Sequence, residues 1–147
     1  MNTTLAEERF VLGLDVGTQS LRAALFDLQG RSVAFGIAPI DTTFPRPTWA
    51  EQDPAQWWSA ARAAVQKALA QAGAAPERVA AIGLDCTACT VLACDLAGNP
   101  LRPALLWMDQ RSFREAETIS ATGHPVLRYV SGRVSLEWML PLSLIHI

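Results

Sequence analysis

The stretch Phe10-Val-Leu-Gly-Leu-Asp-Val-Gly-Thr-Gln-Ser-Leu-Arg22 decides the fold of this chain. Its apolar run ends in one carboxylate, Asp15, and leads into a Gly-Thr turn, after which a second apolar run begins at Leu21. Two apolar runs joined by a short polar turn predict a β-hairpin. A glycine such as Gly17 lets the backbone approach a ligand closely, consecutive N–H groups bind anions, and a carboxylate can hold hydrated Mg²⁺. The tip therefore favours phosphate binding, although an ordinary hairpin with polar turn residues has the same pattern.

The composition describes a globular protein of about one domain. Of the 147 residues, 50% are hydrophobic and 18% are charged, and the formal net charge is −2. That balance gives no electrostatic reason to expect nucleic acid or an anionic membrane as a partner. No apolar run approaches the roughly 20 residues of a membrane span, and the N-terminus lacks the basic-then-apolar pattern of a secretory signal. We therefore expect a cytoplasmic protein.

Three cysteines need a separate interpretation. Cys86 and Cys89 have the C-x-x-C spacing of redox and zinc sites. However, there is no second pair, and the two histidines, His124 and His146, are distant in sequence. Apolar runs on both sides of the pair favour small thiols that are buried or line a turn over metal ligands. The odd count, completed by Cys94, argues against a disulfide framework.

The order of elements predicts an α/β fold with a mixed sheet. Asp53 and Pro54 predict a helix start, since aspartate suits the N-cap and proline the first helical position, and Gly73 predicts the helix end. Trp57 and Trp58 lie at helical spacing with apolar neighbours, so at least one is expected in the core. A proline-rich irregular passage, 39–54, precedes this helix. The other expected elements are strands at 10–15, 21–27, 31–37, 79–84, 91–95 and 104–107, a turn at 85–90 and a helix at 112–121.

Four blocks of sequence carry a resemblance to a known family. They are Gly13-Leu-Asp-Val-Gly-Thr-Gln-Ser-Leu-Arg22, Trp49-Ala-Glu-Gln-Asp-Pro54 with Trp57-Trp58, Ile82-Gly-Leu-Asp-Cys-Thr-Ala-Cys-Thr90 ending in Asp95, and Leu106-Trp-Met-Asp-Gln-Arg111. The first block alone also resembles chaperones, actins and other sugar kinases. In combination, the blocks resemble the N-terminal, sugar-binding domain of the FGGY carbohydrate kinases. The resemblance implies a fold of the actin-like, ribonuclease-H-like type, and ATP and Mg²⁺ as cofactors.

The resemblance implies that the hairpin tip lies on the phosphate side of a kinase site. Asp15 would orient the metal ion through water near the transferring phosphoryl group, because such catalysis is mostly positioning and charge stabilisation. Thr18 and the backbone of Gly17 and Gln19 would hold phosphate oxygens. Arg22 would pair with Asp15, help to neutralise phosphate, or simply be solvated.

The resemblance also implies a sugar side. Trp107 would offer its face to the sugar and Asp109 would accept hydroxyl hydrogen bonds, whereas the alternatives are a core aromatic and a turn-capping carboxylate. Ala88 and Cys89 stand where glycerol kinases carry an arginine and a glutamate that bind glycerol. The small residues here resemble the ribulokinase group, so a ketopentose such as ribulose is the expected substrate. Xylulose, an erythritol-type polyol and glycerol are the alternatives.

The resemblance divides the chain into three parts. Residues 1–9 are expected to be disordered, residues 10–141 to form part of the kinase N-terminal domain, and residues 142–147 to be a non-native tail. This tail matches the translation of a sequencing-library adapter. The catalytic base of the family is an aspartate expected beyond residue 147, so this chain would contain no catalytic residue and be inactive alone. The full-length parent would bind sugar and ATP. Whether the full-length protein forms a homo-oligomer stays open. The alternative is a stand-alone sugar- or nucleotide-binding module.

Overall fold

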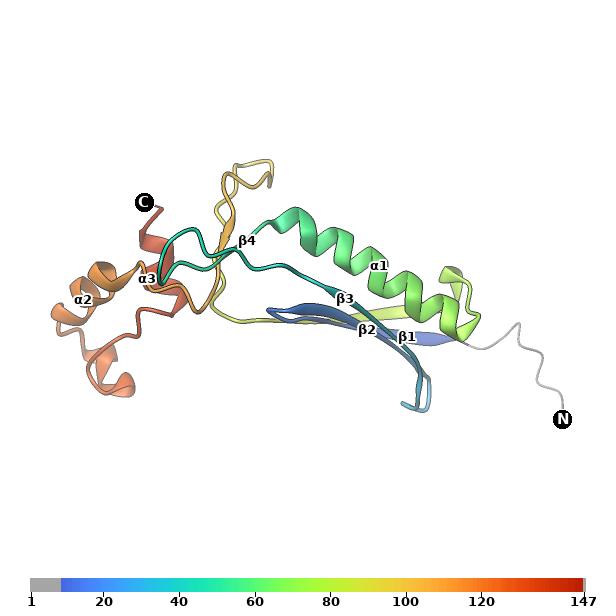
Figure 1. The fold of residues 1–147 in the computed structure, drawn as a ribbon. Coiled ribbons are helices and arrows are strands. Elements are labelled where there is room, and N and C mark those ends of the chain that lie inside the picture. Colours follow the sequence, from blue (N-terminus) through green and yellow to red (C-terminus); the bar gives the residue numbers. More distant parts are fainter. Residues whose placement is uncertain (1–8, 147) are drawn as a thin grey trace, which may run out of the picture. The chain divides into compact units, whose positions relative to one another are not determined.

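The computed structural model describes residues 9–146. Within this range the chain forms two compact units, each described by itself. The first takes in the chain up to Ile40 together with Ala55–Cys86, and the second takes in Asp41–Pro54 and the chain from Thr87 onward. Figure 1 shows the ribbon and labels several elements of each unit.

The first unit contains a four-stranded sheet in the order β3-β2-β1-β5. Its strands are β1 (Phe10–Val16), β2 (Ser20–Asp27), β3 (Ser32–Pro39) and β5 (Val79–Cys86). β1 pairs antiparallel with β2, and β2 pairs antiparallel with β3, whereas β1 pairs parallel with β5. A parallel pair needs a long crossover between its strands, and the chain between β3 and β5 provides it. The expected mixed α/β sheet is confirmed.

Helix α1 (Pro54–Ala72) lies along one face of this sheet (Figure 1). Alternate residues of the strands, such as Leu12 and Leu25, are buried against it, because successive side chains of a strand point to opposite faces. The helix spans the residues that the sequence predicted, and Gly73 follows it with a φ of +61°. Trp57 packs against the core and Trp58 is 81% exposed, so one of the two tryptophans is a core residue, as expected.

Gly36 on β3 is the point of closest approach between the sheet and α1. A Cβ atom placed on this glycine would lie 2.0 Å from the backbone oxygen of Ala64 and 3.0 Å from the backbone nitrogen of Ala68. Since both neighbours are backbone atoms of the helix, only glycine lets the strand and the helix pack this tightly.

The second unit contains little regular structure. A two-residue strand β4 (Glu51–Gln52) pairs antiparallel with β6 (Ala104–Leu105). Two helices, α2 (Phe113–Ala121) and α3 (Met139–Leu144), contact each other. Short 3₁₀ turns at Pro125–Val130 in this unit and at Pro76–Arg78 in the first complete the described elements.

Four expectations about local structure differ from what the structure shows. The expected strand at 91–95 is represented by isolated bridges, Val91 with Leu105 and Cys94 with Pro100. Here Asp95 accepts hydrogen bonds from Ala97 N, Asn99 N and the Asn99 side chain, which curl the chain into a loop. β6 is shorter than the expected strand 104–107, because the chain turns after it. β4 lies in the passage expected to be irregular, and β5 continues into the expected turn at 85–90.

The expectations for the two ends of the chain remain predictions. Of the residues expected to be disordered, 1–8 lie outside the described residues and Arg9 is exposed. Part of the segment interpreted as a non-native tail belongs to α3, where Leu142 is buried and its N–H donates to Trp138 O at 3.2 Å; residue 147 lies outside the described residues. Within residues 9–146, no helix has the length and apolar character needed to cross a bilayer.

Candidate functional site

In the first unit, three charged residues lie in a row across neighbouring strands. Asp15 on β1 is in register with Arg22 on β2 and with Asp85 on β5. Arg22 Nη1 lies 2.7 Å from Asp15 Oδ2, and the two side chains are 49% and 45% exposed. Of the roles considered for Arg22, the structure therefore contains the ion pair with Asp15. Asp85 Oδ1 accepts the N–H of Cys86 at 3.0 Å.

The turn between β1 and β2 is closed by its own backbone. The N–H of Gly17 donates to Ser20 O at 3.1 Å, which closes the turn. The N–H of Ile40, directly after β3, donates to Gln19 O at 3.0 Å and ties the turn to the end of that strand. A Cβ on Gly17 would lie 3.2 Å from the Ser20 oxygen, so the tight turn itself favours glycine. Thr18 is half-buried and Gln19 is exposed at the tip. The Gly17 amide is therefore engaged in closing the turn, while Thr18 and Gln19 form its outer end.

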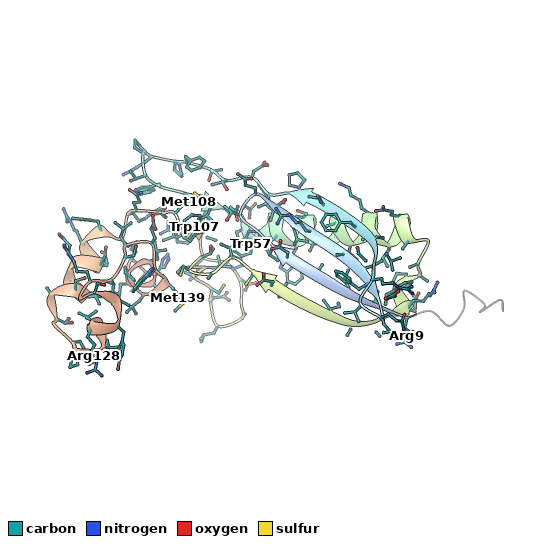
Figure 2. The ribbon with its side chains drawn as sticks, turned by 90° about the horizontal axis from the view of Figure 1, so that it is seen from below. Arg9, Trp57, Trp107, Met108, Arg128 and Met139 are labelled. Carbon is teal, nitrogen blue, oxygen red and sulfur yellow. The ribbon has the colours of Figure 1, made fainter. Side chains whose placement is uncertain are left out.

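A hollow of about 450 Å³ opens beside the Asp15–Arg22 pair. Its floor contains small residues from three strands, since Gly13 is in register with both Ala24 and Gly83. Figure 2 shows this unit with the sheet in front of α1. The other lining residues are Leu14, Asp15, Arg22, Phe26, Phe35, Leu84 and Asp85. One end of the hollow thus carries charge, and the rest is apolar.

In the second unit, Trp107 stands at the corner of a turn. The N–H of Asp109 donates to Leu106 O at 2.9 Å, which places Trp107 and Met108 at the two central positions of the turn. The Trp107 side chain is 38% exposed, and Figure 2 shows it next to Met108. An aromatic ring at a turn corner with part of its surface in solvent can offer a face to a ligand.

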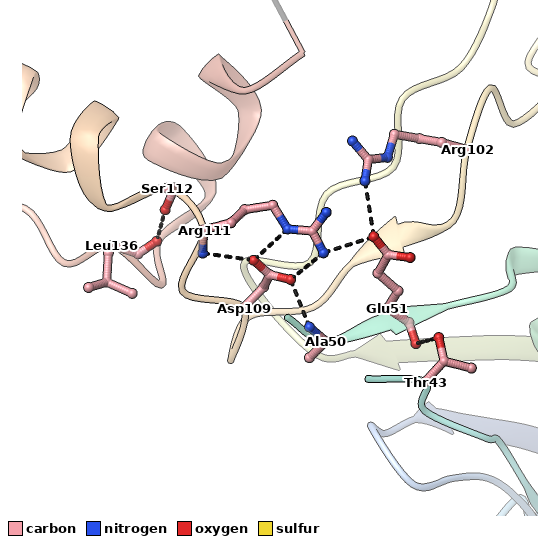
Figure 3. A network of polar contacts seen from close by, with 8 residues as sticks. All are labelled: Thr43, Ala50, Glu51, Arg102, Asp109, Arg111, Ser112 and Leu136. Atoms are coloured by element: carbon pink, nitrogen blue, oxygen red, sulfur yellow. Dashed lines mark hydrogen bonds and ion pairs between the residues drawn. The ribbon is translucent and has the colours of Figure 1, made fainter. Parts of the chain in front are cut away.

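Asp109 is fully buried beneath this turn, and its carboxylate accepts four hydrogen bonds (Figure 3). Oδ2 accepts the N–H of Ala50 and Nη2 of Arg111, both at 2.7 Å. Oδ1 accepts the backbone N–H of Arg111 at 3.0 Å and its Nε at 2.8 Å. Burial alone would raise the pKa of Asp109, but the hydrogen bonds from the Arg111 side chain and from the two backbone N–H groups outweigh it and lower the pKa.

Arg111 links Asp109 to a second carboxylate. Its side chain is 7% exposed, and Nη2 lies 2.8 Å from Glu51 Oε1 on β4. The same oxygen is 3.0 Å from Arg102 Nη2. Burial would lower the pKa of the Arg111 guanidinium, but its hydrogen bonds to Asp109 and Glu51 outweigh this and raise it. The guanidinium carbon also lies 3.7 Å from the centre of the Trp49 ring, a cation–π contact.

Sequence reasoning had assigned no role to Arg111 or Glu51, although both lie in the blocks that carry the family resemblance. The available signal was that both charged residues stand beside tryptophans and apolar residues in the sequence. A charge that is buried in such surroundings needs a partner of opposite charge. The sequence could not say which charge pairs with which.

The turn that contains Ala88 and Cys89 lies in the second unit, as Trp107 does. Ala88 is exposed, and Cys89 is half-buried with a φ of +65°. Val91 exchanges two backbone hydrogen bonds with Leu105, at 2.9 and 2.8 Å. These bonds attach the chain that follows the 88–89 turn to the strand that precedes Trp107. The structure thus brings these predicted sugar-side segments onto one small framework.

The described residues contain no ready-made metal site. Among residues 9–146, no group of three or more His, Cys, Asp or Glu side chains is placed to hold a metal ion. The three cysteines are unpaired thiols: Cys86 and Cys94 are exposed, and Cys89 is half-buried. Cys86 ends strand β5 and Cys89 lies in a turn, and the alternative of buried small thiols does not hold for Cys86 and Cys94.

Solved structures resemble this chain over most of its length. The crystal structure of a xyloylose kinase from Brucella ovis matches with a TM-score of 0.80 and 34% identity, over 91% of this chain and 28% of that one. The xylulose kinase from Rhodospirillum rubrum matches with a TM-score of 0.71 and 34% identity, over 78% of this chain and 23% of that one. These neighbours define the class of protein, an α/β domain of the actin-like, ribonuclease-H-like fold.

Sequence comparison identifies the family. Residues 10–146 match the N-terminal domain of the FGGY family of carbohydrate kinases, and the chain belongs to that family. It is 33% identical to the glycerol kinase of Thermococcus onnurineus (strain NA1), over 90% of this chain and 29% of that protein. It is also 33% identical to the ribulokinase of Geobacillus thermodenitrificans (strain NG80-2), over 90% of this chain and 28% of that protein. The chain thus spans less than a third of these relatives, whose names cover different substrates.

Proposed function

We propose that this chain is the phosphate- and sugar-side part of an ATP-dependent carbohydrate kinase, inactive by itself, whose substrate is a ketopentose such as ribulose. The observation that carries the proposal is the half-exposed Asp15 at the end of β1, beside a closed hairpin turn, in a chain of this family. Family membership favours sugar phosphorylation, and relatives named ribulokinase and xylulose kinase favour a ketopentose.

The residues around Asp15 fit Mg²⁺ bound together with a nucleotide. Mg²⁺ is commonly held by one or two carboxylates, with phosphate oxygens and water as its other ligands. Asp15 offers such a carboxylate, and its exposure leaves room for water between it and the ion. Bound Mg²⁺ and ATP would supply the phosphoryl group and neutralise its charge. Asp15 would orient the hydrated metal, and Thr18 and Gln19 at the tip of the turn would contact phosphate oxygens.

Arg22 has two roles in this proposal. With no nucleotide bound it neutralises Asp15, at 2.7 Å. When the phosphates arrive, its guanidinium is close enough to the same place to pair with their oxygens instead, because guanidinium binds phosphate well. This exchange would keep the local charge balanced during binding.

On the sugar side, the proposal gives Trp107 the role of a wall for the C–H face of the sugar. Ala88 and Cys89 would leave space for the ketose, since neither carries the charged side chain that glycerol kinases use there. Asp109 would contribute to the same site by holding the turn that carries Trp107.

The test uses the protein encoded by the whole reading frame. Asp15→Asn is expected to lower turnover of D-ribulose with ATP and Mg²⁺ by about 10²-fold or more, the usual size of a lost electrostatic contact to the transition state. Sugar affinity should be unchanged. Glu77→Gln, which removes an exposed carboxylate from the 3₁₀ turn before β5, is the matched control and should have no effect.

Two outcomes would contradict the proposal. Normal turnover by the Asp15→Asn protein would remove the phosphate-side assignment. Faster turnover of glycerol or erythritol than of ribulose and xylulose would remove the ketopentose assignment and leave the kinase assignment intact. Trp107→Ala should raise KM for the sugar more than it lowers kcat, since it removes a binding surface.

A further inference from the structure

The turn that carries Trp107 is attached on both sides to the segment 48–51. Before the turn, the N–H of Leu106 donates to Ala50 O at 3.0 Å. After it, the N–H of Gln110 donates to Thr48 O at 3.0 Å. Between them, the Asp109 carboxylate accepts the N–H of Ala50 at 2.7 Å. Trp107 therefore sits on a short span of chain held at both ends against one neighbouring segment.

One of these attachments, the hydrogen bond from Ala50 N–H to Asp109, uses a side chain, and Arg111 holds that side chain. Its guanidinium binds both oxygens of the Asp109 carboxylate and, through Nη2, also reaches Glu51 on β4 (Figure 3). It also lies over the ring of Trp49, which belongs to the segment 48–51. The guanidinium thus fixes the orientation of the carboxylate that joins the turn to residue 50.

The charges of this group are balanced. Two guanidinium groups, from Arg102 and Arg111, meet two carboxylates, from Glu51 and Asp109. A buried ion-pair network of this kind often contributes little net stability, because the cost of removing the charges from water offsets their attraction. Its geometric demand is high, since a planar guanidinium must meet two carboxylates at once. Its strongest effect is therefore on the conformation of the segments that it joins.

We propose that Arg111, with Asp109 and Glu51, is a positioning unit that holds the Trp107 turn in the conformation that binds sugar. This deepens the proposed function, on which its sugar-binding part rests. Asp109 then acts on the sugar through Trp107, because its oxygens are occupied by four protein donors and its side chain is fully buried. Arg111 is a positioning residue and has no contact with substrate in this proposal.

The direct test follows Trp107 itself in the chain as it exists. The protein is labelled with 5-fluorotryptophan, and the ¹⁹F resonance of Trp107 is identified by its loss in Trp107→Phe. Arg111→Lys keeps the positive charge but cannot make the paired bonds to Asp109 and Glu51. The Trp107 resonance is expected to shift or broaden in this variant, while the resonances of Trp57 and Trp58 on α1 stay in place.

Two further variants keep the test decisive. Arg114→Lys makes the same chemical change at an exposed position on α2 and should leave the Trp107 resonance unchanged. Glu51→Gln removes one charge of the network and keeps the shape of the side chain. It provides the same test if the Arg111→Lys protein does not fold. A purely structural role would lower the unfolding midpoint without moving the Trp107 resonance of the folded protein. An unmoved resonance in the folded Arg111→Lys or Glu51→Gln variant overturns the proposal.

Sugar binding is measured separately, by titrating the whole-frame protein with D-ribulose. Arg111→Lys is expected to weaken binding by about tenfold, because the Trp107 turn must then be ordered when the sugar binds, and this ordering reduces the affinity. A moved resonance with unchanged ribulose affinity overturns the sugar-binding part of the inference. Absence of ribulose binding in the unmodified protein overturns the proposed substrate, and the fluorine result still decides whether Arg111 positions the turn.

Discussion

Gly36→Ala tests the packing on which the first unit depends. Real Cβ atoms essentially never come within 3.0 Å of another heavy atom, and the new methyl group would lie 2.0 Å from Ala64 O. The nearest atoms belong to the backbone of α1, so no flexible side chain can turn aside. The strand and the helix must separate by about 1 Å or more to relieve the overlap.

The expected cost follows from two opposing effects. Overpacking of a core costs about 1–3 kcal/mol, and contact with backbone places Gly36→Ala near the upper end. Replacing glycine by alanine also restricts the unfolded chain, which stabilises the folded state by about 0.4–1 kcal/mol. The free energy of unfolding should therefore fall by about 2 kcal/mol. With a urea dependence of about 2 kcal/mol per molar, the midpoint should fall by about 1 M.

The assay is urea unfolding of the fluorotryptophan-labelled chain, followed through the ¹⁹F signal of Trp57. This ring packs against the core of the first unit and so reports on that unit. Gly83→Ala on β5 is the matched control: nothing lies within 4 Å of its added Cβ, so its midpoint should stay level or rise slightly. Equal midpoints for the two variants would refute the close contact between β3 and α1.

Two further predictions concern the buried core and the buried carboxylate. Leu25 is fully buried, so Leu25→Ala should lower the free energy of unfolding by about 2–5 kcal/mol in the same urea assay. Leu28 is 63% exposed, so the control Leu28→Ala should change the free energy of unfolding by less than about 0.5 kcal/mol. The lowered pKa of Asp109 means that its ionised form stabilises the fold above its ordinary pKa of 3.8, and that this stability is lost as the pH falls through the lower value in the folded protein. An acid titration of the Trp107 ¹⁹F signal should therefore show a transition below pH 3.8 that is absent in Asp109→Asn.

A definite result would contradict each of these two predictions. Similar losses for Leu25→Ala and Leu28→Ala would mean that Leu25 is not in the core. An acid transition that persists in Asp109→Asn would mean that the titration does not belong to Asp109.

The sequence predicted the first unit well, because the signals there are local. Apolar runs mark β1 and β2, alternating apolar residues mark β3, and Asp53, Pro54 and Gly73 mark the limits of α1. The second unit was predicted less well. The residues around Val91 have strand-like composition, but a strand needs a partner along its length, and the loop formed by Asp95 removes it. β4 has only two residues and is defined by its pairing with β6.

The sequence alone identified the residue types of the candidate site, and the tertiary structure decided what surrounds them. An acid at a strand end and a tryptophan in a short motif can be recognised from the chain, because their meaning depends on near neighbours. The pairing of Arg22 with Asp15 was one of the roles that the sequence offered, and the structure contains it. The burial of Asp109 could not be recognised, since its contact with Ala50 joins distant segments: the two residues are 59 positions apart. Which donors bind the Asp109 carboxylate depends on how distant segments of the chain pack around it, and only the tertiary structure determines that packing.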